Sequence, residues 1–353
     1  MNKEAIKNSR AIRYFYYMVV GGVLKRNKLK KVAAKTLCDF GVSFENEKAK
    51  EKYINDMVNT YARYGFGFAE YLCLRFAEKS KKERLQFVAD WEHLGYACAL
   101  NDHKNDEFFD NKWKTYGKFK QFYGREVIFF EDESQFEQFE NFVSSHSKFI
   151  IKPLDLSCGQ GIQIIKSKDF EWTKEKFVSL LSEYNGNFIA EDLIVQSPEV
   201  AKLHPASVNT VRVPTIRLDD ETLIVHPFFR VGQNGKNVDN AGAGGIICDV
   251  NAETGRVFAA ADEHGNTFDS HPQTNEPLID FQLPRWDEAK KLVNQLANVI
   301  PDNRYTGWDL ALTDSGWILV EANRRGQFVW QIPSQIGFRD EINSILKKLG
   351  KKY

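Results

Sequence analysis

The pattern of apolar and charged residues changes near residue 123, and this change limits the folds that the chain can adopt. Up to that point, charged stretches carry apolar residues at spacings of three and four, without a proline, as is typical of helices. From Val127 onward, short runs rich in β-branched and aromatic residues alternate with helical windows. We therefore expect an α+β body behind a mostly helical front. The predicted strands cover residues 127–130, 149–152, 162–166, 188–191, 210–217 and 223–231, and the predicted helices cover 134–145 and 173–184.

The composition excludes several classes of protein. The 353 residues carry a formal net charge of zero, which argues against nucleic acid as the main partner. The five cysteines are scattered without a CxxC pair, so neither a disulfide framework nor a zinc cluster is expected. No apolar run reaches the roughly 18 residues of a transmembrane helix. We expect a soluble, cytoplasmic protein of two or three domains, and the sequence does not indicate its oligomeric state.

The amino-terminal segment has two interpretations. Its first 35 residues contain ten Lys or Arg and one Glu, arranged around an apolar run over residues 14–24. Such a segment can form a helix that docks on the body of the protein. It can also lie on an anionic membrane surface, which would make the protein peripheral at the inner face of the membrane.

Two apolar runs near the carboxyl terminus predict a hairpin with oxygen ligands at its open end. Residues 307–312 and 317–322 read as strands joined by a short polar turn. Period-two alternation then places Glu321 and Asn323 on one face, within reach of Asp309 on the neighbouring strand. Oxygen ligands of this kind suit Mg²⁺ that also holds water and nucleotide phosphates. The alternative is an ordinary hairpin with polar residues at its end.

A lysine and a glycine-rich turn upstream offer groups to phosphates. Lys152 ends a buried-looking strand, and the turn that follows exposes backbone N–H groups that can close over an anion. The spacing is neither GxxxxGK[ST] nor a GxGxxG that opens a helix, which disfavours P-loop and Rossmann proteins. A plain hairpin next to a lysine remains the alternative.

Further polar residues follow along the chain. The strand that ends at Glu191 and Asp192 can present its edge to an adenine ring. Arg212 and Arg230 lie on strands, where they either pair with acids or clamp a carboxylate or a transferring phosphoryl group. The glycine-dense loop over residues 238–247 suggests close approach to a ligand or to another backbone, and a mobile loop is the simpler alternative.

In chain order these segments resemble the ATP-grasp superfamily, and in particular its sugar-transfer-associated branch, which is linked to cell-surface polysaccharide biosynthesis. The resemblance runs from about residue 63 to 337 and includes residues 109–122, 207–212 and 239–245. It implies an ATP-grasp fold, in which two α+β subdomains sandwich ATP. It assigns phosphate binding to Lys112 and Lys152, the lid to Cys158, Gly159, Gln160 and Gly161, the adenine hinge to Glu191, Asp192 and Leu193, the ribose to Glu199, and the metal to Asp309, Glu321 and Asn323.

The resemblance divides the chain into a helical region (1–110), a small lid subdomain (111–195) and a large subdomain with the metal site (196–353). Two features depart from the family pattern. Arg324, Arg325 and Gly326 replace the proline that often follows the metal-binding asparagine, and the first hundred residues are helical rather than α/β.

The function implied by the resemblance is an ATP- and Mg²⁺-dependent ligase. Such an enzyme phosphorylates a small-molecule carboxylate and joins the acylphosphate to an amine, here in surface-glycan assembly from an amino acid or a sugar acid. Arg212 and Arg230 would stabilise the acylphosphate or its successor. Two alternatives stay open: a kinase that phosphorylates a hydroxyl, and a non-catalytic nucleotide-binding adaptor of glycan machinery.

Overall fold

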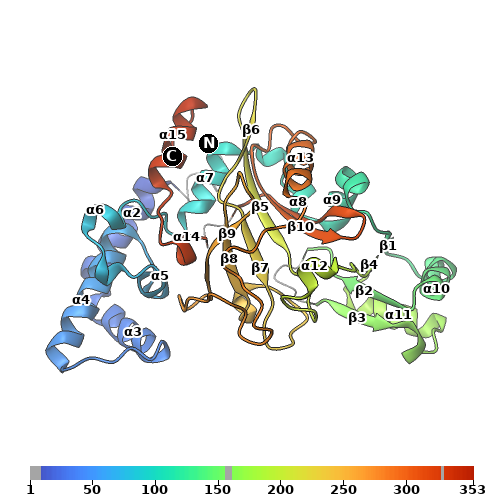
Figure 1. Cartoon of the computed structure of the whole chain (residues 1–353), viewed down its shortest axis with the longest axis horizontal. Coiled ribbons are helices and arrows are strands. Elements are labelled where there is room, and N and C mark those ends of the chain that lie inside the picture. The colour runs from blue at the N-terminus through green and yellow to red at the C-terminus, as the bar shows by residue number, and fades with distance from the viewer. Residues whose placement is uncertain (1–8, 156–160, 327–329) are drawn as a thin grey trace.

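The structure confirms the helical front. The computed structural model describes residues 9–155, 161–326 and 330–353, and Figure 1 shows the helices of residues 10–84 at one end, a large sheet in the middle and a smaller sheet at the other end. A π-helical turn, Val20–Leu24, joins the first two helices. The helices of this front are α2 (Arg10–Val19), α3 (Arg26–Asp39), α4 (Glu47–Tyr64), α5 (Phe68–Cys73), α6 (Lys81–Arg84), α7 (Glu92–Leu100) and α8 (Glu107–Asp110).

A buried glutamate fastens the first and last helices to the same point. Glu92, in α7, is fully buried and binds Arg10 of α2 at 3.0 Å and Arg339 at 2.6 Å. Arg339 begins the last helix, α15 (Arg339–Lys348). Beside this cluster, Tyr17 packs edge-on against Tyr61, with 5.1 Å between the ring centroids. One face of α2 is therefore docked on the body, as one of the two interpretations of this segment requires.

Gly65 allows α4 to end directly beneath α2. Its φ of 77° is left-handed, and its N–H caps the helix by bonding to the Tyr61 carbonyl. A Cβ at this position would lie 2.4 Å from the Trp91 Nε1 and 2.6 Å from a ring carbon of Tyr17. Only glycine meets both requirements, so α2 can pack closely here.

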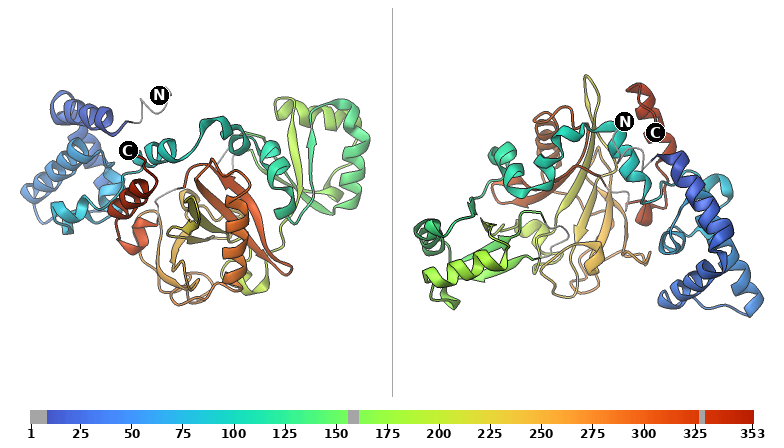
Figure 2. Two further views of the ribbon diagram at one scale, coloured as in Figure 1. Left: turned by 90° about the horizontal axis from the view of Figure 1, so that it is seen from above. Right: turned by 180° about the vertical axis from the view of Figure 1, so that it is seen from behind.

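The smaller sheet forms a separate lobe, which Figure 2 shows standing apart from the large sheet. Its four strands are antiparallel in the order β1-β4-β2-β3. One face packs on two helices through a core rich in phenylalanine, in which Phe139 and Phe177 stack at 4.8 Å. The lobe contains β1 (Val127–Phe130), α10 (Phe136–Ser145), β2 (Lys148–Lys152), β3 (Gln163–Lys166), α11 (Lys174–Glu183) and β4 (Phe188–Asp192), close to the predicted bounds.

The large sheet has seven strands, in the order β11-β10-β5-β7-β8-β9 with β6 beside β5. One face packs on α13 (Trp286–Ala297) and on α9 (Lys112–Phe119), whereas the other packs on α7 and α15. The remaining elements are β5 (Val211–Arg217), β6 (Thr222–Ile224), β7 (Phe228–Val231), β8 (Ile246–Val250), β9 (Val257–Ala261), β10 (Tyr305–Thr313), β11 (Gly316–Asn323), α12 (Pro198–Ala201) and α14 (Gln331–Ser334).

The single strand predicted over residues 223–231 is wrong. The chain forms β6 and then β7, and both pair with β5. Between them stand His226, with a φ of 46°, and Pro227. Proline has no N–H for a ladder and histidine in a left-handed conformation leaves the strand path, so the pairing is interrupted there.

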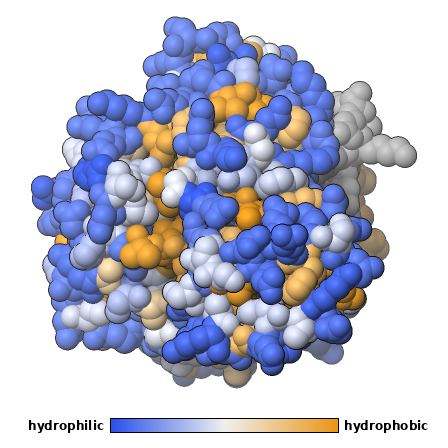
Figure 3. All heavy atoms as spheres, turned by 90° about the vertical axis from the view of Figure 1, so that its right-hand side faces the viewer, coloured by the Kyte–Doolittle hydropathy of each residue, from blue (hydrophilic) through white to orange (hydrophobic). Residues whose placement is uncertain are grey.

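The apolarity of the helices and of the surface can be compared with what contact with a membrane requires. Among the described residues, we find no helix with the length and apolarity needed to span a bilayer. Seen from the side of the smaller lobe, the surface is mainly hydrophilic, with apolar patches separated from one another (Figure 3). Among the described residues of this lobe, the exposed large apolar side chains are Ile162, Ile164 and Phe170.

Candidate functional site

Three charged side chains stand in one row across the edge of the large sheet. The hairpin of β10 and β11 is confirmed, and its register sets Asp309 directly opposite Glu321. On its other side, Asp309 lies opposite Arg212 of β5. Directly opposed residues of antiparallel strands project on the same face with Cβ atoms about 5 Å apart. The structure thus brings Glu321, Asp309 and Arg212 together.

Asp309 is buried between two arginines. Arg212 donates from Nε to Oδ1 and from Nη2 to Oδ2, the latter at 2.9 Å, and Nη2 of Arg230 lies 2.9 Å from the same Oδ2. Burial acts to raise the pKa of Asp309, but the two guanidinium groups outweigh it and hold that pKa below its usual value. Asp309 is therefore ionised at neutral pH and shares its charge with both arginines.

Arg230 has a second acid on its other side. Thr210 receives hydrogen bonds on its hydroxyl oxygen from Arg230 Nε at 3.0 Å and Nη2 at 2.6 Å, and donates its own proton to Asp239. Burial acts to lower the pKa of Arg230, yet Asp309 and Asp239 raise it. The result is a buried network in which two acids and a hydroxyl fix the position of one guanidinium group.

The glycine-dense loop that carries Asp239 is packed against itself. A Cβ on Gly245 would lie 2.2 Å from the Asp239 carbonyl oxygen. Of the explanations that the sequence offered for these glycines, the structure supports the close approach of another backbone segment at Gly245.

A second charged cluster joins the smaller lobe to the large sheet. Glu191 of β4 is buried and binds Lys152 of β2 at 3.0 Å and Arg125 at 2.9 Å. Arg125 also donates to the carbonyl oxygen of Leu319 at 2.7 Å, two residues before Glu321 in β11. A single arginine thereby connects the lysine-bearing lobe to the acid-bearing hairpin.

Lys112 lies at the junction of the two clusters. It begins α9, and its backbone N–H bonds to the Leu154 carbonyl at 3.0 Å. Burial lowers its pKa, an effect that Lys152 increases and that Glu321 and Glu191 oppose. Two lysines and two acids from four elements therefore act on one another electrostatically.

The other residues singled out from the sequence are more dispersed. Asp192 faces the opposite side of the small sheet, where it contacts His146 and accepts from the Glu126 N–H at 2.9 Å. Leu193 follows β4 and is half-buried. Glu199 is exposed in α12, where it adds to the effect of Glu288 in raising the pKa of Arg285.

Part of the predicted lid falls outside the described residues, namely Cys158, Gly159 and Gln160. Gly161 is described, with a φ of 69°, and its carbonyl accepts from the Tyr184 hydroxyl at 2.8 Å. Gly161 thus has a left-handed backbone two residues before β3, and its role in a lid stays a prediction.

The hairpin residues fit Mg²⁺ by the chemistry of their donors. Glu321 and Asp309 supply carboxylate oxygens, and the Asn323 amide lies 3.5 Å from Asp309 Oδ2. In the part of the chain that the structure describes, no group of three or more His, Cys, Asp or Glu side chains forms a metal cluster. The predicted set differs from such a group because it includes an amide, and metal binding there stays a prediction.

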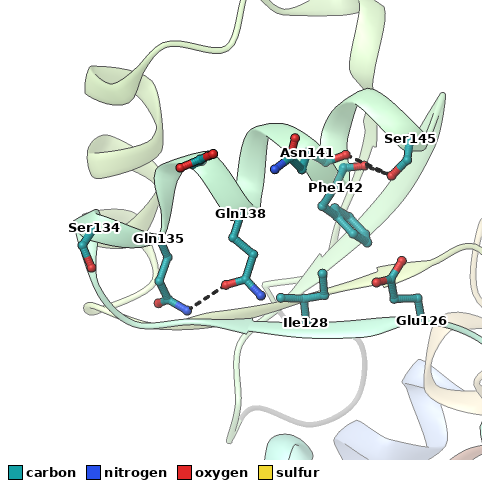
Figure 4. Close-up of a pocket in the computed structure, with 9 residues that line it drawn as sticks. Glu126, Ile128, Ser134, Gln135, Gln138, Asn141, Phe142 and Ser145 are labelled. Atoms are coloured by element: carbon teal, nitrogen blue, oxygen red, sulfur yellow. Dashed lines mark hydrogen bonds between the residues drawn. The ribbon is translucent and has the colours of Figure 1, made fainter.

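A cavity of about 610 Å³ lies in the smaller lobe between α10 and β1 (Figure 4). Amide groups of Gln135, Gln138 and Asn141 line it together with Phe142. None of the described residues that line it is a lysine or an arginine, so these residues offer no cation to a phosphate. The charged clusters around Glu191 and Asp309 remain the candidate site.

Arg125 was missed by the sequence analysis, because it follows no motif and its partners lie far along the chain. Replacing it by lysine should lower the free energy of unfolding by about 2 kcal/mol, since an ammonium group cannot bind Glu191 and the β11 carbonyls together. Urea unfolding measures this change. The matched control is Arg75→Lys, an exposed position, and an equal loss in both variants would contradict the proposed bridge.

Comparison with known proteins identifies one family. The family model described as sugar-transfer associated ATP-grasp matches residues 93–347. A search of the curated proteins finds no match.

Several solved structures are similar at low identity. They include the ATP-grasp ligase PsnB complexed with a minimal precursor (13% identity, TM-score 0.43, covering 71% of this chain and 63% of that one). D-alanine-D-alanine ligase from Helicobacter pylori has 13% sequence identity and a TM-score of 0.42, and the match covers 71% of this chain and 63% of that one. Phosphoribosylamine–glycine ligase from Thermotoga maritima has 9% sequence identity and a TM-score of 0.44, and the match covers 72% of this chain and 57% of that one. The chain thus spans less than two thirds of the length of each, and no functional conclusion follows from likenesses this distant.

Proposed function

Because the chain belongs to the sugar-transfer-associated ATP-grasp family, we propose that it is an ATP-dependent, ADP-forming ligase that acts on a carboxylate. The observation that carries the proposal is the convergence of Lys112, Lys152 and Glu321 beside Asp309 and its two arginines. Cations on one side and carboxylates on the other are what phosphoryl transfer from a nucleotide requires.

The lysines are proposed to hold the phosphates of ATP. Lys152 is paired with Glu191 in the structure, so its ammonium group is already positioned before any phosphate arrives. Lys112, whose pKa is lowered by burial, gains most from a phosphate nearby, because a charge that is poorly hydrated interacts more strongly with an anion. Arg125, through its hydrogen bond to the Leu319 carbonyl, would hold the smaller lobe against the hairpin while the phosphates are bound.

Mg²⁺, held by Glu321, Asn323 and Asp309, would supply charge neutralisation at the transferring phosphoryl group. The three residues lie on two adjacent strands, with Glu321 opposite Asp309 and the Asn323 amide nitrogen 3.5 Å from Asp309 Oδ2. Binding would also compete with the arginines for Asp309. This competition would leave part of the charge of Arg212 and Arg230 available to an anionic substrate group.

The acceptor is proposed to be a small molecule of surface-glycan assembly, an amino acid or a sugar acid together with an amine. The proposal includes a cytoplasmic location and peripheral association with the membrane through the basic amino-terminal segment. The family description supports the glycan part, and the charge of residues 10–35 supports the membrane part.

The direct test is ADP release from Mg²⁺-ATP with a panel of carboxylates, with and without amines, and with sugars that carry only hydroxyl groups. We expect stimulation by a carboxylate and a joined product in mass spectra when an amine is present. A stable phosphorylated sugar would identify a kinase instead. Binding of ATP without turnover under every condition would favour an adaptor.

A further inference from the structure

The first helix has a second face that the body does not cover. Arg10, Tyr14 and Tyr17 form the docked face of α2, through contacts with Glu92, Trp91 and Tyr61. Figure 2 shows this helical region at the end of the molecule remote from the smaller lobe. The uncovered face continues through the π-helical turn into α3.

Exposed apolar residues are concentrated on this segment. Of the sixteen large apolar residues that are exposed in the described chain, seven lie between residues 12 and 32. Val23 and Leu24 are among the most exposed, at 75% and 71%. The seven residues are Ile12, Phe15, Tyr16, Met18, Val23, Leu24 and Val32.

The same segment is strongly basic. Between residues 9 and 38 the chain has eight Lys or Arg and no Asp or Glu, although its total net charge is zero. An apolar face flanked by cations is the pattern of a helix that lies in the interface of an anionic bilayer. The positive charge of this surface therefore favours an anionic bilayer as the partner.

A cavity of about 690 Å³ opens beside this apolar face. Its walls come from α2, the π-helical turn, the start of α3, α4 and α6, and combine aromatic and aliphatic side chains with cations. The apolar walls include Phe15, Met18 and Ala62, and the cations are Arg26, Arg63, Lys81 and Arg84. This volume is typical of sites for small ligands.

Among the described residues that line the cavity, Asp56 is the only acid, and it is already neutralised. Asp56 forms a bidentate ion pair with Arg84, at 3.1 and 2.7 Å, and accepts from the Tyr71 hydroxyl at 2.5 Å. Burial acts to raise the pKa of Asp56, but these hydrogen bonds outweigh it and lower that pKa. The positive charges of Arg26, Arg63 and Lys81 are therefore in excess around the opening.

We propose that this cavity binds the headgroup of an anionic phospholipid while the apolar face of α2 enters the bilayer beside it. The phosphate would lie between Arg63, Lys81 and Arg26, and Phe15 and Met18 would contact the acyl chains. This site goes beyond the proposed ATP site, shares no residue with it, and gives the membrane association a defined ligand. Its test measures binding, so its failure is distinguishable from failure to turn over ATP.

The test is flotation of the full chain with vesicles of phosphatidylcholine alone and of phosphatidylcholine mixed with phosphatidylglycerol. We expect association with the mixed vesicles only, weakening as NaCl is raised. The variant R63Q/K81Q should lower the partition coefficient about 25-fold, because each cation near an anionic surface contributes about a factor of five. F15S/M18S should lower it at least about tenfold.

Matched controls keep the test specific. Lys82→Gln removes a charge from α6 next to Lys81 without altering the cavity lining, and Ile164→Ser removes an exposed apolar side chain from the other end of the molecule. Both should bind as the unmodified chain does, and thermal melting should show that all variants fold.

Three outcomes would overturn the proposal: equal binding to neutral vesicles, unchanged binding of R63Q/K81Q, or release by inorganic phosphate beyond that caused by NaCl of equal ionic strength. The last result would assign the cations to a free anion rather than to a bilayer.

Discussion

Replacing Glu321 by glutamine is expected to lower the rate of ADP release at least about a hundredfold while leaving the fold intact. The substitution keeps the size of the side chain and removes the negative charge that the proposed Mg²⁺ site needs. Glu321 is only half-buried, opposite Asp309 at the open end of the hairpin, so its loss costs the folded chain little. Steady-state ADP release at saturating Mg²⁺-ATP measures the rate.

Two further measurements separate a metal role from a general effect. The unmodified chain should be stabilised against heat by ATP with Mg²⁺, and the E321Q variant should lose the part of this stabilisation that depends on Mg²⁺. Glu221→Gln, an exposed glutamate on the loop before β6, is the matched control and should retain full turnover. Turnover of E321Q within tenfold of the unmodified chain would remove Glu321 from the proposed metal site.

The sequence was sufficient for the parts of the site that are local in the chain. Glu321 and Asn323 share a face because strands alternate, whereas Glu321 stands opposite Asp309 because the register shifts by one residue between Asp309 and Leu310, which the turn alone does not predict. The strands of the smaller lobe were likewise predicted close to their bounds. The single strand predicted over residues 223–231 overlooked Pro227, although proline rarely stands inside a central strand.

The pairing between distant strands could not be predicted in this way. Arg212 and Arg230 were expected on sheet faces, but their meeting at Asp309 depends on the order β10-β5-β7, which brings together residues 97 positions apart. The contacts of Arg125 could not be predicted either, because Glu191 lies 66 positions away in the chain and Leu319 lies 194 positions away. A single sequence contains no periodicity that reports such contacts.

The sheet against which a helix packs is equally hard to predict, and this affects the predicted division of the chain into subdomains. Residues 111–195 were assigned to the lid subdomain, and this boundary stays a proposal. In the structure, Tyr116 and Phe119 of α9 pack in the core of the large sheet, where Phe119 meets Trp308 at 5.4 Å. An amphipathic pattern predicts that a helix has a buried face, but not which sheet covers it.

Replacing Asp309 by asparagine is expected to have the largest effect on stability, a loss of about 3 to 5 kcal/mol in the free energy of unfolding. The substitution leaves two buried guanidinium groups without the carboxylate between them. Arg230 keeps Thr210 and lies 3.7 Å from Asp239, whereas Asp309 is the acid that Arg212 contacts among the described residues. Most of the loss should therefore come from Arg212. Denaturant unfolding measures it, with the exposed Asp220→Asn, expected to change stability by less than about 0.5 kcal/mol, as control.

The dependence on pH distinguishes this ion pair from simple packing. The pKa of Asp309 is lowered in the folded chain, so its contribution is fully present above its unfolded pKa, about 3.9, and is lost as pH falls toward the folded value. The difference in stability between the unmodified chain and the D309N variant should be largest near neutral pH and should shrink below about pH 4. A difference that stays constant over this range would show that asparagine disturbs packing rather than charge. Because the same carboxylate is proposed to face Mg²⁺, D309N should also lose ADP release, whereas E321Q should lose it without the loss of stability.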